Sequence, residues 1–167
     1  MKKTLLYLLI AGVLSACSLS YKFNGASIDY SLTKTIAISD FPNQAPLVYP
    51  PLEQRFNEEL KDLFTRNTRL QFVKQNADLE MEGEIVGYEL TPLAVQEDSF
   101  ASETRLTLTV RMRFRNNKQE GQDREETVSA YRNFPADRML TDVQDQLISE
   151  LVKEIVDQIF NVTMSNW

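Results

Sequence analysis

The sequence predicts an α+β fold, a two-layer sandwich in which two helices pack on one face of a mixed sheet of four to five strands. Two long stretches alternate between apolar and charged residues, as strands with one buried and one solvated face do. Two further stretches repeat apolar residues every three or four positions, which is typical of amphipathic helices. The expected order along the chain is β-α-β-β-β-β-α.

The first three elements are a strand, a helix and a second strand. Residues 34–41 alternate, with Ile36 and Ile38 on one side, and predict the first strand. The helix is expected over about 51–66, because proline suits a first turn and one face is apolar: Leu52, Phe56, Leu60, Leu63 and Phe64. A short strand over 70–73 follows. A crossover of this length joins parallel strands, so we expect the two strands to run in parallel.

The stretch 78–116 predicts an antiparallel hairpin with its loop at 96–99. Suppose that the numbers of the two residues in each cross-strand pair sum to about 195. This single register then gives matching neighbours on both faces of the sheet. On the outer face, acidic residues then lie opposite basic ones: Glu84 and Arg111, Glu82 and Arg113, Glu80 and Arg115. On the inner face, apolar residues meet: Met81 and Phe114, Ile85 and Val110.

The later part of the first hairpin strand and the last helix carry further signals. After Ile85 the apolar phase changes, which predicts a β-bulge or a second buried face. At the dipeptide Thr91-Pro92 we expect either that the regular strand pairing ends or that the pairing lies at an edge of the sheet. The last helix is expected over about 141–162, where apolar residues keep helical spacing. Thr141 and Gln144 match a capping box at its start.

One face of the returning hairpin strand carries four arginines, a residue type that binds phosphate and carboxylate groups: Arg105, Arg111, Arg113 and Arg115. The facing glutamates would partly neutralise three of them. A strand over 124–134 is expected to pair with the same strand and to place Glu126 opposite Arg113. The arginine stripe therefore has two interpretations, a solvated face with exposed ion pairs or an anion-binding surface.

The N-terminal residues predict export and a lipid anchor. Two lysines precede an apolar run from Leu5 to Leu14, which is too short to span a membrane. The run ends in Leu14-Ser15-Ala16-Cys17, which resembles the lipobox of bacterial lipoproteins. That resemblance implies that the signal peptide, residues 1–16, is removed and that Cys17 is lipidated. Two or more acyl chains hold a protein stably on a membrane.

The rest of the chain is then a lipidated N-terminal tether over 17–31 and a single domain over 32–167. The tether has Ser18 after the cysteine rather than the Asp that resembles an inner-membrane retention signal, and no run of acids marks export to the cell surface. The resemblance to other lipoproteins therefore implies the outer membrane, and we expect the domain on its periplasmic side.

Composition argues against several classes of function. The 167-residue chain has a net charge of −6, and loss of the two signal-peptide lysines leaves −8. An acidic domain is a poor candidate for nucleic acid, whose binding depends on neutralising phosphates. There is no His, so the commonest general base and the commonest metal ligand are missing. With Cys17, the only Cys, lipidated, no thiol nucleophile remains either. We expect no enzymatic activity, no cofactor and no metal.

Several stretches together resemble the LptE family of lipopolysaccharide-assembly lipoproteins, in the form found in Bacteroidetes: Tyr21-Lys22-Phe23-Asn24-Gly25-Ala26-Ser27-Ile28, Pro51-Leu52, Gly83-Glu84-Ile85-Val86-Gly87-Tyr88, Thr91-Pro92, Arg105-Leu106-Thr107 and Asn166-Trp167. The resemblance runs across the mature chain. It implies a partner, the outer-membrane β-barrel LptD, and a non-catalytic role as plug and assembly factor in lipopolysaccharide transport to the outer leaflet. The four arginines are then candidates for contact with lipopolysaccharide or with the barrel.

The sequence leaves one alternative function open. A lipoprotein on the periplasmic side could act alone and bind a lipid or a small apolar ligand. Such a protein needs a cavity between the helices and the sheet, whereas a plug needs a compact domain with a polar surface, because the interiors of large barrels are polar.

Overall fold

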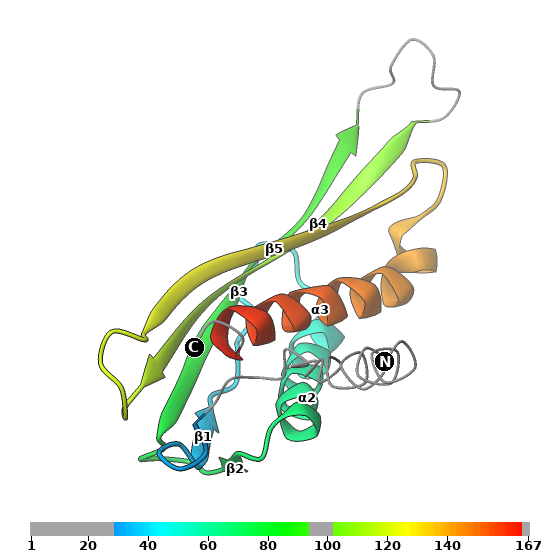
Figure 1. The fold of residues 1–167 in the computed structure, drawn as a ribbon. Coiled ribbons are helices and arrows are strands. Elements are labelled where there is room, and N and C mark those ends of the chain that lie inside the picture. The colour runs from blue at the N-terminus through cyan, green and yellow to red at the C-terminus, as the bar shows by residue number, and fades with distance from the viewer. Residues whose placement is uncertain (1–28, 94–101, 165–167) are drawn as a thin grey trace, which may run out of the picture.

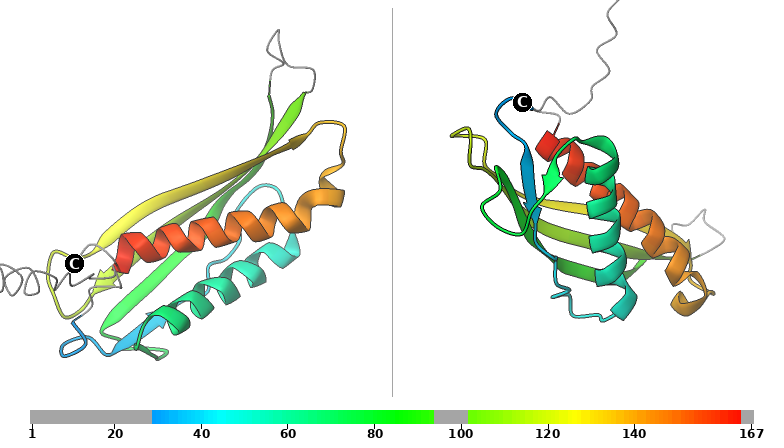
Figure 2. Two further views of the ribbon diagram at one scale, coloured as in Figure 1. Left: turned by 45° about the vertical axis from the view of Figure 1, so that its right-hand side comes forward. Right: turned by 90° about the horizontal axis from the view of Figure 1, so that it is seen from below.

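The computed structural model describes residues 29–93 and 102–164. The elements are β1 (Thr35–Ile38), α2 (Pro50–Asn67), β2 (Gln71–Phe72), β3 (Leu79–Leu93), β4 (Glu103–Asn116), β5 (Arg124–Pro135) and α3 (Leu140–Met164). They form one five-stranded mixed sheet in the order β2-β1-β3-β4-β5. Both helices lie on the same face of this sheet (Figures 1 and 2). The predicted fold class and the predicted order of elements are confirmed.

The strand–helix–strand unit has the predicted parallel pairing, since β1 runs parallel to both β2 and β3. The regular part of β1 ends at Ile38, earlier than the predicted strand. The chain nevertheless continues along β3, where Ile85 N–H donates to the Pro42 carbonyl (3.0 Å) and Gln44 N–H donates to the Ile85 carbonyl (2.9 Å). Beyond Ile85, no described residue pairs with this edge of β3.

The long hairpin has the predicted register. Residues of β3 and β4 pair with numbers that sum to 195 from Leu79 to Ile85. A β-bulge between Ile85 and Gly87 then shifts the register by one residue, which explains the change of apolar phase. Pairing with β4 continues past Thr91-Pro92 to Leu93, so this segment lies at an edge rather than ending the pairing. The predicted loop at 96–99 lies outside the described residues.

The predicted position of Glu126 is wrong by one residue. Arg113 lies opposite Glu125, and Glu126 lies opposite Met112. The buried residues of β5 impose this register, because Val128 must face the core opposite Val110. A shift by one residue would turn polar Thr127 and Ser129 into the core. The sequence of β5 alternates too weakly to reveal this.

The predicted capping box is also wrong. The helix α3 begins at Leu140, so Thr141 lies inside its first turn rather than at the cap. The side chain of Gln144 turns instead toward the sheet, where its Nε2 donates a hydrogen bond to the hydroxyl of Tyr88 (2.6 Å). This contact ties the first turns of α3 to the half of β3 beyond the bulge.

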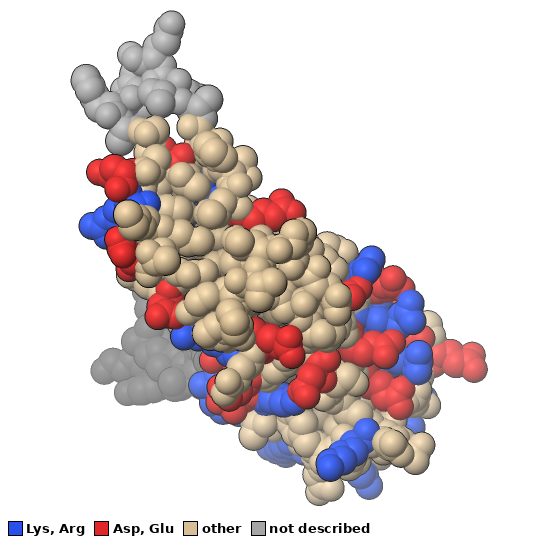
Figure 3. All heavy atoms as spheres, turned by 180° about the vertical axis from the view of Figure 1, so that it is seen from behind, with Lys and Arg blue, Asp and Glu red and all other residues tan. Residues whose placement is uncertain are grey.

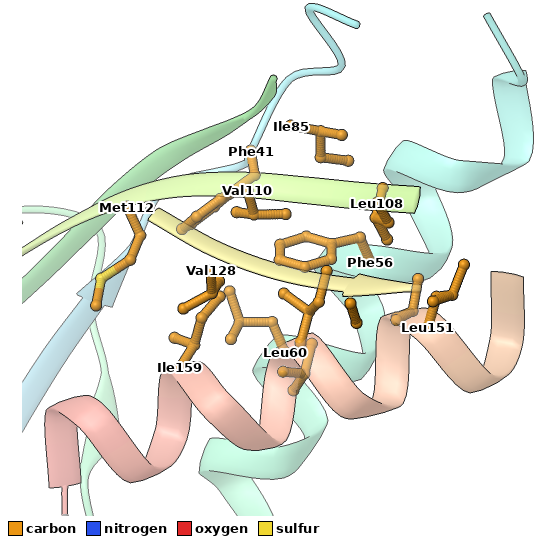
Figure 4. Packing of buried hydrophobic residues seen from close by; sticks show 14 of the residues in the cluster. Phe41, Phe56, Leu60, Ile85, Leu108, Val110, Met112, Val128, Leu151 and Ile159 are labelled. Atoms are coloured by element: carbon orange, nitrogen blue, oxygen red, sulfur yellow. The ribbon is translucent and has the colours of Figure 1, made fainter. Parts of the chain in front are cut away.

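The space between the helices and the sheet is filled with apolar side chains (Figure 4). Fully buried residues come from α2, α3 and the central strands, among them Phe56, Leu60, Leu108, Val110, Leu151 and Ile159. Phe41, which follows β1, packs against Phe56 with ring centroids 5.4 Å apart. Within the described residues, neither helix has the length and apolar character needed to cross a bilayer.

Two polar clusters close the end of the sheet that holds β1 and the β4–β5 turn. The carboxylate of Asp78 accepts the N–H groups of Lys34 (2.8 Å) and Thr35 (3.0 Å) and pairs with Lys118 (3.0 Å). In the turn, Asn116 is almost fully buried and bonds four groups within seven residues of itself: Lys118 N–H, Gln119 N–H, the Gln122 side chain and the Asp123 carboxylate.

Candidate interaction surface on the open face of the sheet

The face of the sheet opposite the helices carries all four predicted arginines. It is built by the outward residues of β3, β4 and β5, and no described helix covers it (Figure 2). In the view from behind, acidic and basic side chains are interleaved rather than separated by sign, and an uncharged area lies in the middle (Figure 3). The register places hydroxyl side chains in the middle of this face: Thr107, Thr109, Thr127 and Ser129.

Three of the arginines form an ion-pair ladder with β3 and β5. Arg111 donates through Nε (3.2 Å) and Nη2 to one carboxylate oxygen of Glu84. Arg115 Nη1 lies 3.1 Å from Glu80 Oε2. Arg113 lies between two carboxylates, at 3.1 Å from Glu125 and 3.7 Å from Glu82. The prediction that glutamates of β3 face these three arginines is confirmed.

The ladder is solvent-accessible, and its charges are already matched. The hydrogen bonds that Arg111 donates to Glu84, together with the attraction between the two charges, raise the pKa of Arg111. A shallow pocket of about 250 Å³ lies over the ladder and is lined by side chains of both signs: Glu82, Glu84, Arg111, Arg113 and Glu125. An incoming anion would have to displace these carboxylates, so the ladder favours a polar, near-neutral contact surface over a strong anion site.

Arg105 differs from the other three arginines. Its guanidinium carbon lies 3.9 Å from the ring centroid of Tyr131, and its Nε donates to Asn133 Oδ1 (3.0 Å). Asn133 in turn donates to Glu103 (2.9 Å). Among the described residues, no carboxylate lies within ion-pair distance of Arg105. Its charge is therefore held by an aromatic ring and an amide, and it stays available to a negatively charged partner.

The sequence prediction missed the neighbours of Arg105 and the pairing of Glu125. Both depend on the register between β4 and β5, in which the numbers of paired residues sum to 238. The other predicted site, Cys17, lies outside the described residues. No group of three or more acidic, His or Cys side chains in residues 29–93 and 102–164 is arranged to hold a metal ion.

Two solved structures share this fold at low sequence identity, and a third resembles it less closely. The rare lipoprotein B from Shewanella oneidensis is 13% identical over 77% of this chain and 92% of its own, with a TM-score of 0.56. A hypothetical protein from Chlamydia trachomatis is 15% identical over 80% of this chain and 99% of its own, with a TM-score of 0.50. A minor lipoprotein from Acinetobacter baumannii is 18% identical over 78% of this chain and 93% of its own, with a TM-score of 0.48.

The comparison of family models identifies the chain. No curated protein matches it. The model of the LptE family, described as lipopolysaccharide-assembly, matches residues 33–163, which is nearly all of the described domain. The chain therefore belongs to the LptE family and has a role in lipopolysaccharide assembly.

Proposed function

We propose that the chain is an outer-membrane lipoprotein, anchored through lipidated Cys17 on the periplasmic side, that acts as a non-catalytic plug and assembly factor of an LptD β-barrel. In this proposal residues 1–16 are the signal peptide, residues 17–31 are the tether and residues 32–167 are the domain that enters the barrel. Lipopolysaccharide passes the complex on its way to the outer leaflet.

The open face of the sheet is the observation that carries the proposal. A plug must fit against the inner wall of a barrel, which is polar and hydrated. The ladder of Arg111, Arg113 and Arg115 presents charge without a large excess of either sign, because each arginine has a carboxylate partner. A surface of this kind can contact polar groups of a hydrated lumen while its charges stay in contact with water.

The filled core argues against the alternative, a protein that binds a lipid or small apolar ligand by itself. Such a ligand needs a cavity lined by apolar groups. The apolar side chains of both helices and the sheet instead pack against one another (Figure 4). The pockets at the ladder and along α2 lie on the surface and have charged linings.

Extraction of the tagged lipoprotein in mild detergent, followed by identification of bound proteins, tests the proposal. We expect an LptD barrel in stoichiometric amount, and depletion of the lipoprotein should lower the level of assembled barrel. The variant Cys17→Ser should leave the domain folded but release it from membranes. Recovery of the wild-type lipoprotein without any barrel would contradict the plug, and a mature protein without acyl chains in mass spectrometry would contradict the anchor.

A further inference from the structure

A basic and apolar patch lies at the end of the sheet where the described chain begins. We call it the basic end patch, and its members are Leu32, Lys34, Arg69, Phe72, Val73 and Lys74. Its apolar members are among the more exposed large apolar side chains, with exposed fractions of 50% for Leu32, 40% for Phe72 and 36% for Val73.

Hydrogen bonds hold the segments of this patch together. Gln71 N–H donates to the Lys34 carbonyl (2.8 Å), and Val73 N–H donates to the Ile36 carbonyl (3.0 Å). Arg69 N–H donates to the hydroxyl of Tyr30 (3.3 Å). The turn before β1, the connection from α2 and the edge strand β2 therefore meet at one end of the molecule.

The charge of this end is opposite to that of the whole chain. Residues 29–36 and 68–76 contain three basic residues and a single acid, Asp29, in a chain of net charge −6. The three bases have no ion-pair partner among the described residues, and the neighbouring Asp78 is neutralised by Lys118. At the lowest part of the face seen in Figure 3, Lys and Arg side chains are visible and the acidic ones lie higher.

We infer that the basic end patch docks on the surface of an anionic phospholipid bilayer. Basic residues beside exposed apolar side chains are the combination that binds the headgroup region, where cations meet lipid phosphates and apolar groups enter the acyl boundary. The inference rests on the proposed function, since the anchor at Cys17 keeps this end near the membrane. The twelve-residue step from Cys17 to Asp29 spans at most about 40 Å.

This surface adjoins the open face of the sheet, since Lys74 lines a pocket together with Glu80, Glu82, Arg113 and Arg115, but it lies far from Arg105. The patch occupies the end of the sheet that holds β2 and the start of β1, whereas Arg105 lies near the other end of β4. Docking through the patch would therefore fix the long axis of the sheet relative to the membrane, with β2 beside the headgroups at the periplasmic mouth of the barrel and the β3–β4 end directed into the lumen.

A single label on the intact lipoprotein tests the inference. Because Cys17 would carry lipid, Val73→Cys provides one reactive thiol for an environment-sensitive fluorophore, and Met139→Cys, 73% exposed, provides the control at the far end. The purified lipoprotein is added to vesicles of phosphatidylcholine with or without phosphatidylglycerol. We expect a blue shift and quenching by brominated lipid for the label at 73 on anionic vesicles only, reversed by high salt, and no change for the label at 139.

Charge reversal gives the matched comparison. Arg69→Glu with Lys74→Glu should lower the docked population roughly tenfold or more, since each basic residue contributes about fivefold at an anionic surface. Arg138→Glu with Lys153→Glu changes the net charge equally, away from the patch, and should leave docking intact. The proposed docking surface is wrong if the fluorescence of the label at 73 does not change on anionic vesicles. It is also wrong if both charge-reversed variants lose docking equally. Flotation with neutral vesicles reports the anchor separately, so failure of the anchor is distinguishable from failure of the patch.

Discussion

Asn57 of α2 binds both backbone polar groups of Phe41. Its Oδ1 accepts the Phe41 N–H (2.8 Å), and its Nδ2 donates to the Phe41 carbonyl (3.1 Å) and to the Glu53 carbonyl (2.9 Å). Phe41 follows the end of β1, where the regular strand pairing has stopped, so its backbone groups need another partner in the core. Asn57, 8% exposed, provides that partner and fixes the position of the Phe41 ring.

Replacement of this amide should destabilise the domain strongly. Asn57→Leu keeps the size of the side chain but leaves a buried N–H and carbonyl of Phe41 unpaired. We expect a loss of about 2–4 kcal/mol in the free energy of unfolding, measured by urea denaturation. The same change at Asn67, an exposed residue of the same helix, should cost far less. Equal losses in the two variants would show that Asn57 has no special role.

Gly83 should not tolerate a side chain. A Cβ at this position would lie 2.3 Å from Cε1 of Phe41 and 2.4 Å from the carbonyl oxygen of Arg111. We expect Gly83→Ala to cost about 1–3 kcal/mol, because the backbone of β4 cannot move away as a flexible side chain could. Adding Phe41→Leu should not restore stability fully, since the contact with the carbonyl remains. A thermal melt of Gly83→Ala identical to that of the wild type would contradict this packing.

Asp78 should make stability depend on pH in acid. The hydrogen bond from Lys34 N–H, with those from Lys118 and Thr35, lowers the pKa of Asp78 from 3.8 to about 2. The folded protein holds the proton of Asp78 more weakly than the unfolded chain does. The contribution of Asp78 to the free energy of unfolding is therefore complete above about pH 4 and is lost as pH falls toward 2. It amounts to about 2 kcal/mol.

The measurement is the free energy of unfolding between pH 2 and 6 for the wild type and Asp78→Asn. The wild type should lose its higher free energy of unfolding relative to the variant as pH falls. Glu150, whose pKa is lowered mainly by a hydrogen bond from Gln146 and also by one from Arg132, contributes equally to both proteins. A constant difference across this range would exclude the proposed linkage.

The arginines of the open face should differ in their effect on partner binding. Arg105→Gln removes a charge that no described carboxylate neutralises, whereas Arg113→Gln removes one that Glu82 and Glu125 already share. We expect the first variant to reduce the barrel recovered with the lipoprotein several-fold and the second to change it little. Circular dichroism controls for folding. If Arg113→Gln has the larger effect, the ladder rather than Arg105 is the contact.

The sequence predicted the parts of the fold in which both faces of an element carry a clear pattern. The hairpin register followed from alternation on two faces at once, and both helices are within about two residues of their expected ends. The prediction was wrong in β5, where the pattern was weak, and at the capping box of α3, where Gln144 bonds to Tyr88 across the core instead.

Some determinants could not be predicted because they depend on residues far apart in the chain. Asn57 gives no sign in the sequence of where its hydrogen bonds go. Arg132 faces the helix side of the sheet and binds Glu150 (3.0 Å) and Glu154 (2.7 Å), a clamp that only the packing of α3 against β5 creates. For the candidate site, the arginine stripe was predicted, but the stacking of Arg105 on Tyr131 needed the register of β5.

The turn between β4 and β5 has a consequence for the order of folding. Asn116 organises it through contacts with near neighbours in sequence, so the β4–β5 hairpin can form after a short loop closure. The pairing of Lys34 with Asp78 closes a loop of 44 residues and should come late. Pulse-labelled hydrogen exchange during refolding should therefore protect the amides of β4 before those of β1, and the sheet should grow from its β5 side toward β2.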